Sequence, residues 1–576
     1  MHSVHWCGVG ALVCALVAAG AASCGTGSAD EPGAARDFNN GPMVVAPGSG
    51  SPGNPAIPPA LNPGGADPMN PTTLPPEVEV KVDLELPQAS ESFVYAANPD
   101  SGTVVIIEAK TLELQTLETG DRPTFLRTLA GTDDAIVLNV GSDDATVMRS
   151  PRQGATTSSV DVVRGANAIA VAPDGKHAVV FFDAEHNAAG GASGSYQDVT
   201  VITLVAAGED RPIDMTVGFK PRDIFFAADS RTAYAVTDDG ISVLDFTEID
   251  RGGSGIARLI SLGADIDQKS LDVSVTPDGR YALARQPSES AVRLIDLADG
   301  KIKTLELAEV PLPEPESGSD EEDAGVTDPA PVEVTDLDLA PSGEFALAVL
   351  RNQAAVLRIP VPSAFDDITQ VKAYQVPNQL VGSGTIAPDG KRALLYTTAV
   401  DVERITVLDL EGDAAPHTVA LRKSIAGVAV APDGETALIV HKKAQGSPND
   451  PGLDADTKID RSFGYSVLRV STGDVKLQVT DVAPGSFTIA PDSGFLFILF
   501  RDDARGIREV QKVDAMSFLV QPIALGSPPI SLGTVPGSER VFVNQDHPDG
   551  RITLINWRTN ETRTVTGFEL NSRIRD

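Results

Sequence analysis

The stretch Val428–His441, written VAVAPDGETALIVH, recurs along this chain in close copies. Proline presets the second position of a tight turn, Asp tolerates the third, and Gly supplies permissive backbone angles at the exit. Apolar and polar residues alternate on both sides of the turn, which predicts a β-hairpin. Clean copies of the turn lie at 173–175, 277–279, 388–390 and 432–434, and variants lie at 228–230, 341–343 and 491–493.

Two further elements follow each hairpin. A short apolar segment comes first, as in GISVLDF (240–246), AVRLIDL (291–297) and RITVLDL (404–410). A more polar segment then closes the unit, as in KIKTLEL (301–307) and VKLQVTD (475–481). The repeat thus has four strands in roughly 48 residues, which predicts an all-β fold, a β-propeller of four-stranded blades.

Three features resemble the YVTN-type propeller family, a relative of the lactonase-like and WD-repeat propellers. They are the Pro-Asp-Gly turn, the blade opening Gly-x-x-Pro at 120–123, 218–221 and 526–529, and the segment Val94-Tyr-Ala-Ala-Asn98. The resemblance spans about residues 88–570. It implies the fold and leaves the function open, because such blades serve many purposes.

The number of blades is the open question about this fold. The sequence holds about eight to ten blade-like repeats, which form either one unusually large ring or two smaller rings in tandem. The alternating segment VEVKVDLEL (78–86) precedes the repeats, and its charged face suits an outer strand that closes the ring.

Charge and cysteine content exclude some classes of partner and bond. The chain of 576 residues has 80 acidic and 45 basic residues, a net charge of −35. Such a surface repels phosphate backbones, so we expect no nucleic-acid partner. The three cysteines are Cys7, Cys14 and Cys24, so we expect no disulfide in the folded body.

The N-terminus predicts export. The apolar run from Gly8 to Ala22 has the length of a signal-peptide core and is short for a membrane span of about 20 residues. The small residues before Cys24 resemble the lipobox of bacterial lipoproteins, which implies cleavage after residue 23 and a lipid on the Cys24 thiol. We therefore expect a lipid-anchored protein of the bacterial cell envelope, on the outer membrane or cell surface; secretion after ordinary cleavage is the alternative.

Three parts of the chain follow from these patterns: a signal peptide (1–23), a linker (24–76) and the propeller (77–576). The linker is rich in Pro and Gly and cannot bury enough apolar surface to offset chain entropy, so we expect disorder. Its reach of about 40 Å suits a tether between a membrane and a folded head.

Three long insertions are expected on a single face of the propeller. Residues 184–198 and 443–464 lie between the second and third strands of their repeats, and 309–333 lies between two repeats. Since successive strands run up and down, all three connections emerge on the face opposite the Pro-Asp-Gly turns. Long loops held by a rigid scaffold commonly bind ligands, so this loop-rich face is the expected binding surface.

Individual residues give weaker indications. His186 and Tyr196 in one insertion, and Asp454, Asp456 and Asp460 in another, are candidate binding residues. The three aspartates supply oxygen ligands of the kind calcium prefers but lack the glycine and terminal Glu of a calcium loop, so a solvated acidic loop is the better interpretation and the metal stays unknown. Recurring aspartates that end the third strand are expected to bond turn amides: Asp245, Asp296 and Asp409.

The sequence provides no catalytic residue and no cofactor. Five histidines lie beyond the signal region, in different repeats and without paired metal-ligand spacing: His177, His186, His417, His441 and His547. We therefore expect a membrane-anchored module that binds or scaffolds an unknown protein or small ligand through the loop-rich face. The alternative is a lactonase-like propeller hydrolase with its site at the axial mouth of the ring.

Overall fold

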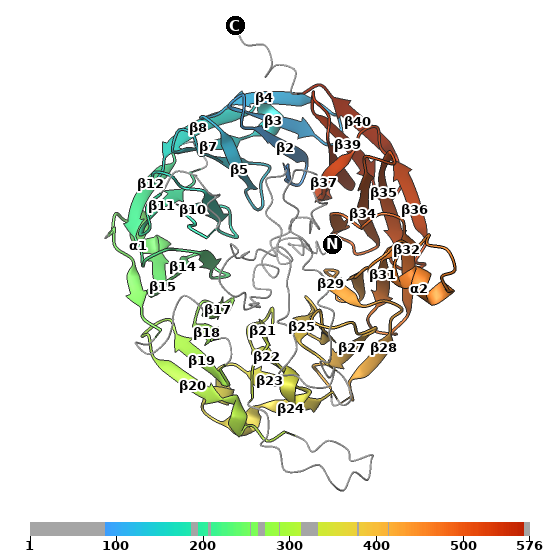
Figure 1. The fold of residues 1–576 in the computed structure, drawn as a ribbon. Helices are drawn as coiled ribbons and strands as arrows, with labels where there is room; N and C mark the ends of the chain where they lie inside the picture. Colours follow the sequence, from blue (N-terminus) through green and yellow to red (C-terminus); the bar gives the residue numbers. More distant parts are fainter. Residues whose placement is uncertain are drawn as a thin grey trace, which may run out of the picture.

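The computed structural model describes most of the chain beyond the expected linker. The described residues are 87–185, 194–205, 209–253, 255–262, 271–286, 289–312, 332–376, 380–412 and 414–568. Cys24, the expected signal peptide, the linker and the segment 78–86 all lie outside them. Within the described residues the chain forms ten four-stranded antiparallel sheets, which fan around a central axis as the blades of one ring (Figure 1).

Each blade is built from four consecutive strands, and we number the blades 1 to 10 in chain order. Blades 1 to 5 comprise β1 (Gln88–Ala89), β2 (Phe93–Asn98), β3 (Thr103–Glu108), β4 (Leu114–Glu118); β5 (Pro123–Thr128), β6 (Ala135–Asn139), β7 (Asp144–Arg149), β8 (Thr156–Asp161); β9 (Ala168–Val171), β10 (His177–Phe181), β11 (Asp198–Thr203), β12 (Arg211–Thr216); β13 (Asp223–Phe226), β14 (Thr232–Thr237), β15 (Gly240–Asp245), β16 (Arg258–Ile260); and β17 (Asp272–Val275), β18 (Tyr281–Arg285), β19 (Ala291–Asp296), β20 (Ile302–Glu306).

Blades 6 to 10 repeat the same plan. They comprise β21 (Asp336–Leu339), β22 (Phe345–Leu350), β23 (Ala355–Pro360), β24 (Lys372–Gln375); β25 (Ser383–Ile386), β26 (Arg392–Tyr396), β27 (Arg404–Asp409), β28 (His417–Ala420); β29 (Ile425–Val430), β30 (Thr436–His441), β31 (Phe463–Arg469), β32 (Val475–Thr480); β33 (Phe487–Ile489), β34 (Phe495–Asp502), β35 (Ile507–Asp514), β36 (Val520–Ala524); and β37 (Pro529–Val535), β38 (Arg540–Gln545), β39 (Arg551–Asn556), β40 (Thr562–Thr566).

The predicted strand roles are confirmed. The apolar segments expected as third strands are β15, β19 and β27, and the polar segments expected as fourth strands are β20 and β32. The first strand of each sheet lies nearest the axis and the fourth lies at the rim (Figure 1). The outer strands are polar because they form the solvent-facing edges of the blades: β40 buries only one of its five residues.

The hydrophobic core lies between blades, not within them. Each of the ten core clusters joins the facing sides of two neighbouring blades. A single twisted sheet of four strands has two apolar faces and cannot cover either by itself, so every blade depends on both neighbours.

One large ring is the correct alternative of the two considered from sequence. Val94 and Val105 of blade 1 share a buried cluster with Phe542 and Leu554 of blade 10, which closes the circle. The guanidinium of Arg540, in β38, also donates a hydrogen bond to the carbonyl of Ala109 after β3, at 2.8 Å. The tandem-ring alternative is wrong, because blade 10 packs against blade 1 and every blade packs against the next one around a single circle.

The Pro-Asp-Gly turns do more than reverse the chain. At 432–434, Asp433 Oδ1 accepts a hydrogen bond from the amide of Glu435 at 2.9 Å, which fixes the turn. Gly434 has φ +70°, a conformation that favours glycine, and a Cβ atom there would approach within 2.8 Å of Asp389 Cγ in the preceding blade. Glycine is therefore required both by the turn and by the close approach of neighbouring blades.

The recurring aspartates at the ends of third strands bond turn amides, as predicted. Asp296 Oδ1 accepts from the amide of Ala298 at 2.9 Å, and Asp409 Oδ1 accepts from Glu411 at 3.0 Å. Asp245 caps the first turn of α1 (Phe246–Asp250) by accepting from the amides of Thr247 and Glu248. These carboxylates are turn and cap residues.

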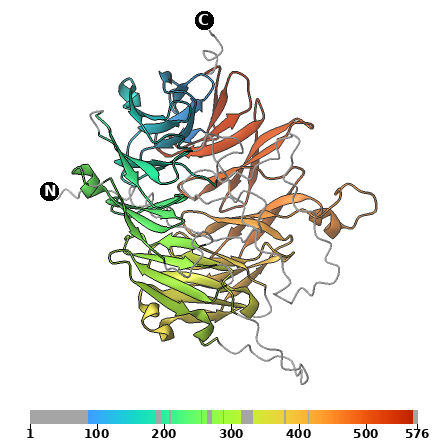
Figure 2. The same cartoon turned by 60° about the vertical axis from the view of Figure 1, so that its left-hand side comes forward.

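The two α-helices of the described residues lie on opposite faces of the ring. Helix α1 follows the third strand of blade 4, whereas α2 (Ala455–Asp460) lies between the second and third strands of blade 8. Figure 2 shows the green α1 at one side of the disc and the orange α2 at the other. Neither is long and apolar enough to cross a membrane, and the same holds for every helix in the described part of the chain.

Candidate functional site

Strand order places the three predicted insertions on one face. The segment 184–198 joins β10 to β11, 443–464 joins β30 to β31, and 309–333 joins β20 to β21. These are second-to-third and blade-to-blade connections, which emerge together in an antiparallel four-stranded blade. The described part of this loop-rich face includes all of 443–464, residues 184–185 and 194–198, and only the ends of 309–333.

The insertion 443–464 is a built structure with its own helix. Asp454 caps α2, its Oδ1 accepting from the amide of Thr457 at 2.7 Å, and this backbone hydrogen bond lowers the pKa of the Asp454 carboxyl. Arg461, near the end of the insertion, forms an ion pair with Asp450 in its first half at 2.8 Å. The amide of Ala444 donates to the Asp460 carbonyl at 2.8 Å, so the two ends of the insertion are held together.

A buried lysine anchors this insertion to the ring. Lys423 precedes β29 and is only 2% exposed, yet its Nζ donates to the carbonyls of Ile459 and Asp460 at 2.8 and 2.9 Å. Those carbonyls belong to the end of α2, where the helix dipole is negative and a cation is favourable. Burial lowers the pKa of the Lys423 ammonium. The ring therefore contributes a fixed charge that determines where the helix sits.

The three candidate aspartates of this insertion act separately. Asp454 is the helix cap, Asp456 forms an ion pair with Arg422, and Asp460 accepts from Lys423 through its backbone carbonyl. No group of three or more His, Cys, Asp or Glu that could hold a metal ion is found among the residues with described positions. The geometry of these aspartates is that of a capped and anchored loop.

Tyr196, predicted from the first insertion, is part of an aromatic cluster. Its ring stacks on Phe219 with the centroids 5.6 Å apart and the planes at 26°, and Phe182 meets it edge-on at 5.4 Å. Tyr196 and Phe219 are 37% and 38% exposed, whereas Phe182 is buried. The other candidate of this insertion, His186, lies outside the described residues.

Sequence reasoning missed Phe219. It lies in the blade opening Gly218-Phe-Lys-Pro221, where the corresponding positions of two other openings hold Asp121 and Ser527. A Cβ atom on Gly218 would overlap the hydroxyl of Thr237, so glycine brings the opening tightly against β14 and turns the next side chain outward. A large, exposed apolar residue at a repeat position that holds polar residues elsewhere is the signal that marks this site.

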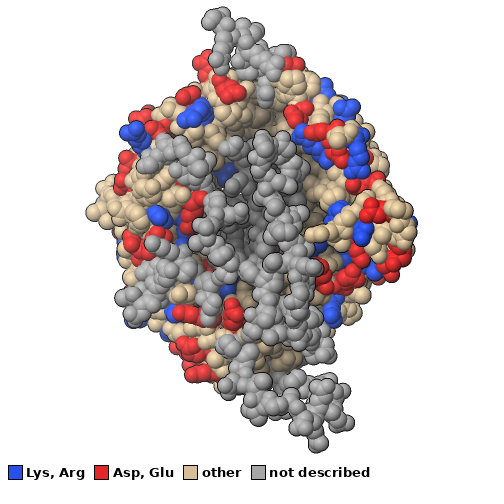
Figure 3. All heavy atoms as spheres, in the orientation of Figure 1, with Lys and Arg blue, Asp and Glu red and all other residues tan. Residues whose placement is uncertain are grey.

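A shallow acidic pocket of about 390 Å³ lies on the same face, between blades 1 and 2. It is formed by the turn 100–103 of blade 1 and the connection 118–121, with Asp100, Glu118 and Asp121 in its lining. Around the rim of the ring, acidic and basic side chains are interspersed (Figure 3). A mixture of charges of both signs keeps this part of the rim solvated.

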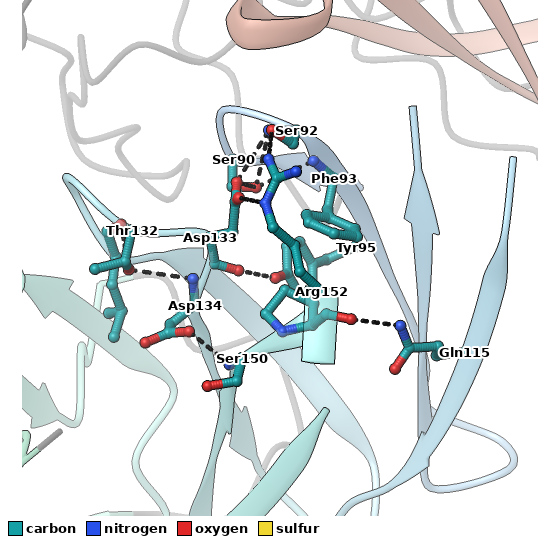
Figure 4. Close-up of polar contacts among 12 residues, drawn as sticks. Ser90, Ser92, Phe93, Tyr95, Gln115, Thr132, Asp133, Asp134, Ser150 and Arg152 are labelled. Atoms are coloured by element: carbon teal, nitrogen blue, oxygen red, sulfur yellow. Dashed lines mark hydrogen bonds and ion pairs between the residues drawn. The ribbon is translucent and has the colours of Figure 1, made fainter. Parts of the chain in front are cut away.

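The opposite face carries a polar latch between blades 1 and 2 (Figure 4). Asp133 accepts from the Ser90 hydroxyl at 2.8 Å and pairs with Arg152 at 3.0 Å, and its carbonyl accepts from Tyr95. Burial, followed by the nearby charge of Asp133, raises the pKa of the Tyr95 phenol. Because these groups hold neighbouring blades together, we assign them to the ring's stability.

The four histidines among the described residues lie in four different blades, as expected: His177, His417, His441 and His547. His177 stacks on Phe246 at 4.3 Å and faces Asp250 at 3.3 Å, which joins blade 3 to blade 4. His441 is buried in blade 8 between the Ser424 carbonyl and the Ser466 hydroxyl. These two side chains are packed as structural groups in different blades, away from each other.

Comparisons with known proteins assign no family to this chain. A scan against protein-family models and a search of curated proteins find no match. Among solved structures, the dihydro-heme d1 dehydrogenase NirN in complex with DHE is 14% identical and covers 65% of this chain and 71% of its own, with a TM-score of 0.37. Apo AztD from Citrobacter koseri is 13% identical over 76% of this chain and 96% of its own, with a TM-score of 0.35. Likenesses at this level carry no argument about ligand or activity.

Proposed function

We propose that this protein is an exported β-propeller, held to the bacterial cell envelope by a lipid on Cys24, that binds a partner through its loop-rich face. The lipobox-like residues before Cys24 support the anchor, and the Pro-Asp-Gly turns with the Gly-x-x-Pro openings support a YVTN-type propeller. The partner is a protein or a small ligand of the envelope.

One observation supports the binding role above the others. The insertion 443–464 carries a capped helix and is fixed to the ring by the buried Lys423. Removing an ammonium from water is costly unless hydrogen bonds replace the lost hydration, so an insertion held this way is more than a tolerated loop. A rigid projecting loop reduces the entropy lost on binding, which is the property a recognition element needs.

Two experiments test the lipid anchor and the binding role separately. Metabolic labelling with a palmitate analogue should require Cys24, and labelling that persists in Cys24→Ala would disprove the anchor. For binding, intact cells expressing the full chain are treated with a chemical crosslinker, and the crosslinked species are compared with those of a variant in which 445–460 is replaced by a short Gly-Ser link.

We expect the discrete crosslinked species of the parent chain to disappear in the loop variant. The matched control is the pair Met516→Ala and Leu519→Ala, because these two exposed residues lie in the turn that joins β35 to β36, on the opposite face. Crosslinks that survive in the loop variant, or that disappear equally in the control, would contradict binding through 443–464.

A further inference from the structure

The aromatic pair Tyr196 and Phe219 is an unusual feature of the loop-rich face. The two residues come from different connections: Tyr196 lies two residues before β11, and Phe219 lies between β12 and β13. Both residues are more than a third exposed. Phe182, which meets Tyr196 edge-on, is buried, so the exposed part of the cluster consists of Tyr196 and Phe219.

The backbone fixes the two rings in place. The amide of Lys220 donates to the Tyr196 carbonyl at 2.7 Å, which ties the two connections together. The amide of Phe219 donates to Asp239 Oδ2 at 2.7 Å, and the Phe219 carbonyl accepts from the amide of Asp238 at 2.7 Å. With its own amide and carbonyl both bonded, the turn that carries Phe219 is preorganised.

The backbone at Lys220 also adopts a conformation that is rare for residues other than glycine. Lys220 has φ +53°, in the left-handed region, which costs on the order of 1 kcal/mol for a residue other than glycine. This conformation accompanies the outward position of Phe219 and leaves the Lys220 ammonium 5.5 Å from the centre of the Phe219 ring. Strain of this kind persists where the surrounding hydrogen bonds fix the turn.

Polar groups border the pair. Gln197 and Asp239 are exposed, and Lys220 is half-buried with its ammonium near the Phe219 ring. Ligand sites commonly combine an apolar platform with a few hydrogen-bonding groups that orient the ligand. Here the carboxylate of Asp239 and the ammonium of Lys220 lie beside Phe219, and Gln197 is the exposed neighbour of Tyr196 in the chain.

We propose that Tyr196 and Phe219 form a stacking platform for a sugar ring, so that the loop-rich face binds a glycan; the proposal rests on the proposed function of this face. A pyranose whose substituents are all equatorial presents a flat face of C–H groups that packs on an aromatic ring, while its hydroxyls bond to side chains at the edge. β-1,4-Linked chains of glucose or N-acetylglucosamine have this geometry.

The alternatives fit the surface less well. Bases of a nucleic acid also stack on aromatic rings, but the net charge of −35 opposes a phosphate backbone. A standard protein interface buries about 800 Å² on each partner and centres on anchors that become fully desolvated. Two partly exposed rings bordered by charged groups are too few to form the desolvated centre of such an interface.

The experiment uses the full chain, purified in detergent, with chitohexaose and cellohexaose as probes in isothermal titration calorimetry. We expect binding of at least one probe, weakened at least about tenfold in Tyr196→Ala and in Phe219→Ala. Tyr196→Phe keeps the ring and should stay within about threefold of the parent chain. Met516→Ala, an equally exposed apolar residue on the other face, should bind as the parent does.

Each other result overturns the proposal. Failure of both probes to bind, or binding that is unchanged in the two alanine variants, would remove the platform. A crosslinked protein partner lost in Phe219→Ala, without any glycan binding, would assign the rings to a protein interface. Because crosslinking through 443–464 is measured separately, glycan binding can fail while the proposed function of the face stands. Thermal melting of each variant confirms that the ring is folded.

Discussion

The hydroxyl of Ser493, in blade 9, accepts a hydrogen bond from the backbone amide of Asp433, in blade 8, at 3.2 Å. Ser230 and Asp174 repeat the arrangement between blades 4 and 3, at 3.1 Å. Both serines occupy the turn position that holds glycine elsewhere, and both have a positive φ, 55° and 56°. Where Ser stands in place of Gly in the turn, the residue adds backbone strain, and a hydrogen bond to the neighbouring blade offsets it.

This exchange predicts different effects of two small substitutions at residue 493. Ser493→Ala keeps the strained conformation and loses the hydroxyl, so we expect the free energy of unfolding to fall by about 1 to 2 kcal/mol. Ser493→Gly loses the same bond but relieves the strain, and should change stability by about 0.5 kcal/mol or less. Urea denaturation followed by fluorescence measures both. Ser342→Ala, at an exposed turn position, is the control, and equal effects of Ala and Gly at 493 would contradict the account.

Lys423 is predicted to determine the order of the insertion 443–464. Lys423→Met keeps the length of the side chain but leaves the carbonyls of Ile459 and Asp460 without their ammonium donor. We expect faster hydrogen exchange at the amides of α2 and earlier proteolytic cleavage within 445–460, with a smaller change in the rest of blade 8.

The exposed Lys443 provides the comparison for that experiment. Its Nζ bonds only the nearby Gly446 carbonyl at 3.0 Å and stands over the Phe463 ring. Lys443→Met should leave exchange in α2 nearly unchanged because this contact lies at the edge of the loop. If both variants loosen α2 to the same degree, the buried ammonium is not the anchor.

Ring closure gives a third prediction. Arg540 is 7% exposed and donates to the Ala109 carbonyl, so Arg540→Met removes a charge-assisted bond between the first and last blades. We expect a loss of about 1 to 3 kcal/mol in unfolding free energy and a lower melting temperature by calorimetry. Arg563, an exposed residue that bonds the Lys110 carbonyl at 3.3 Å, should matter less when changed to Met. A larger effect at Arg563 would place the closure elsewhere.

The fold could be predicted because it follows from local patterns that repeat. The turn at 432–434 and the alternation around it are encoded within fourteen residues, and the same pattern marks most of the blades. Closure could not be predicted, because it depends on contacts such as Arg540 with Ala109, which are far apart in sequence. Local patterns contain no information about the angle between blades, and that angle decides whether a ring closes with eight or ten.

The site was predicted less completely for a similar physical reason. Strand order gave the loop-rich face, and Tyr196 was identified from its insertion, but Phe219 reaches it from another connection. The three aspartates looked like a group because they are close in sequence, whereas the helix at 455–460 directs them to a cap, an ion pair and a backbone contact. Where a short helix begins and ends decides which aspartate becomes its cap and which way the others point. The spacing of the carboxylates in the sequence does not show where those ends lie.

His441 makes stability depend on pH. Its Nδ1 faces the Ser424 carbonyl, which requires Nδ1 to donate, and its Nε2 lies 2.7 Å from the Ser466 hydroxyl and accepts from it. Burial lowers the pKa of His441 from 6.5 to about 4, so the ring is neutral in the folded protein near pH 7. Above pH 6.5 neither state binds the extra proton, so this contribution to stability is fully present.

Between pH 6.5 and 4 the His441 side chain binds a proton in the unfolded chain but not in the folded protein. The free energy of unfolding therefore decreases as the pH falls through this window. A shift of this size corresponds to roughly 3 kcal/mol at its lower end. We expect the parent chain to lose more stability than His441→Gln between pH 7 and 4.5, as measured by urea midpoints. His417→Gln, at an exposed histidine, should follow the parent curve. Parallel curves for the parent and His441→Gln would show that His441 is protonated equally in both states, against the burial argument.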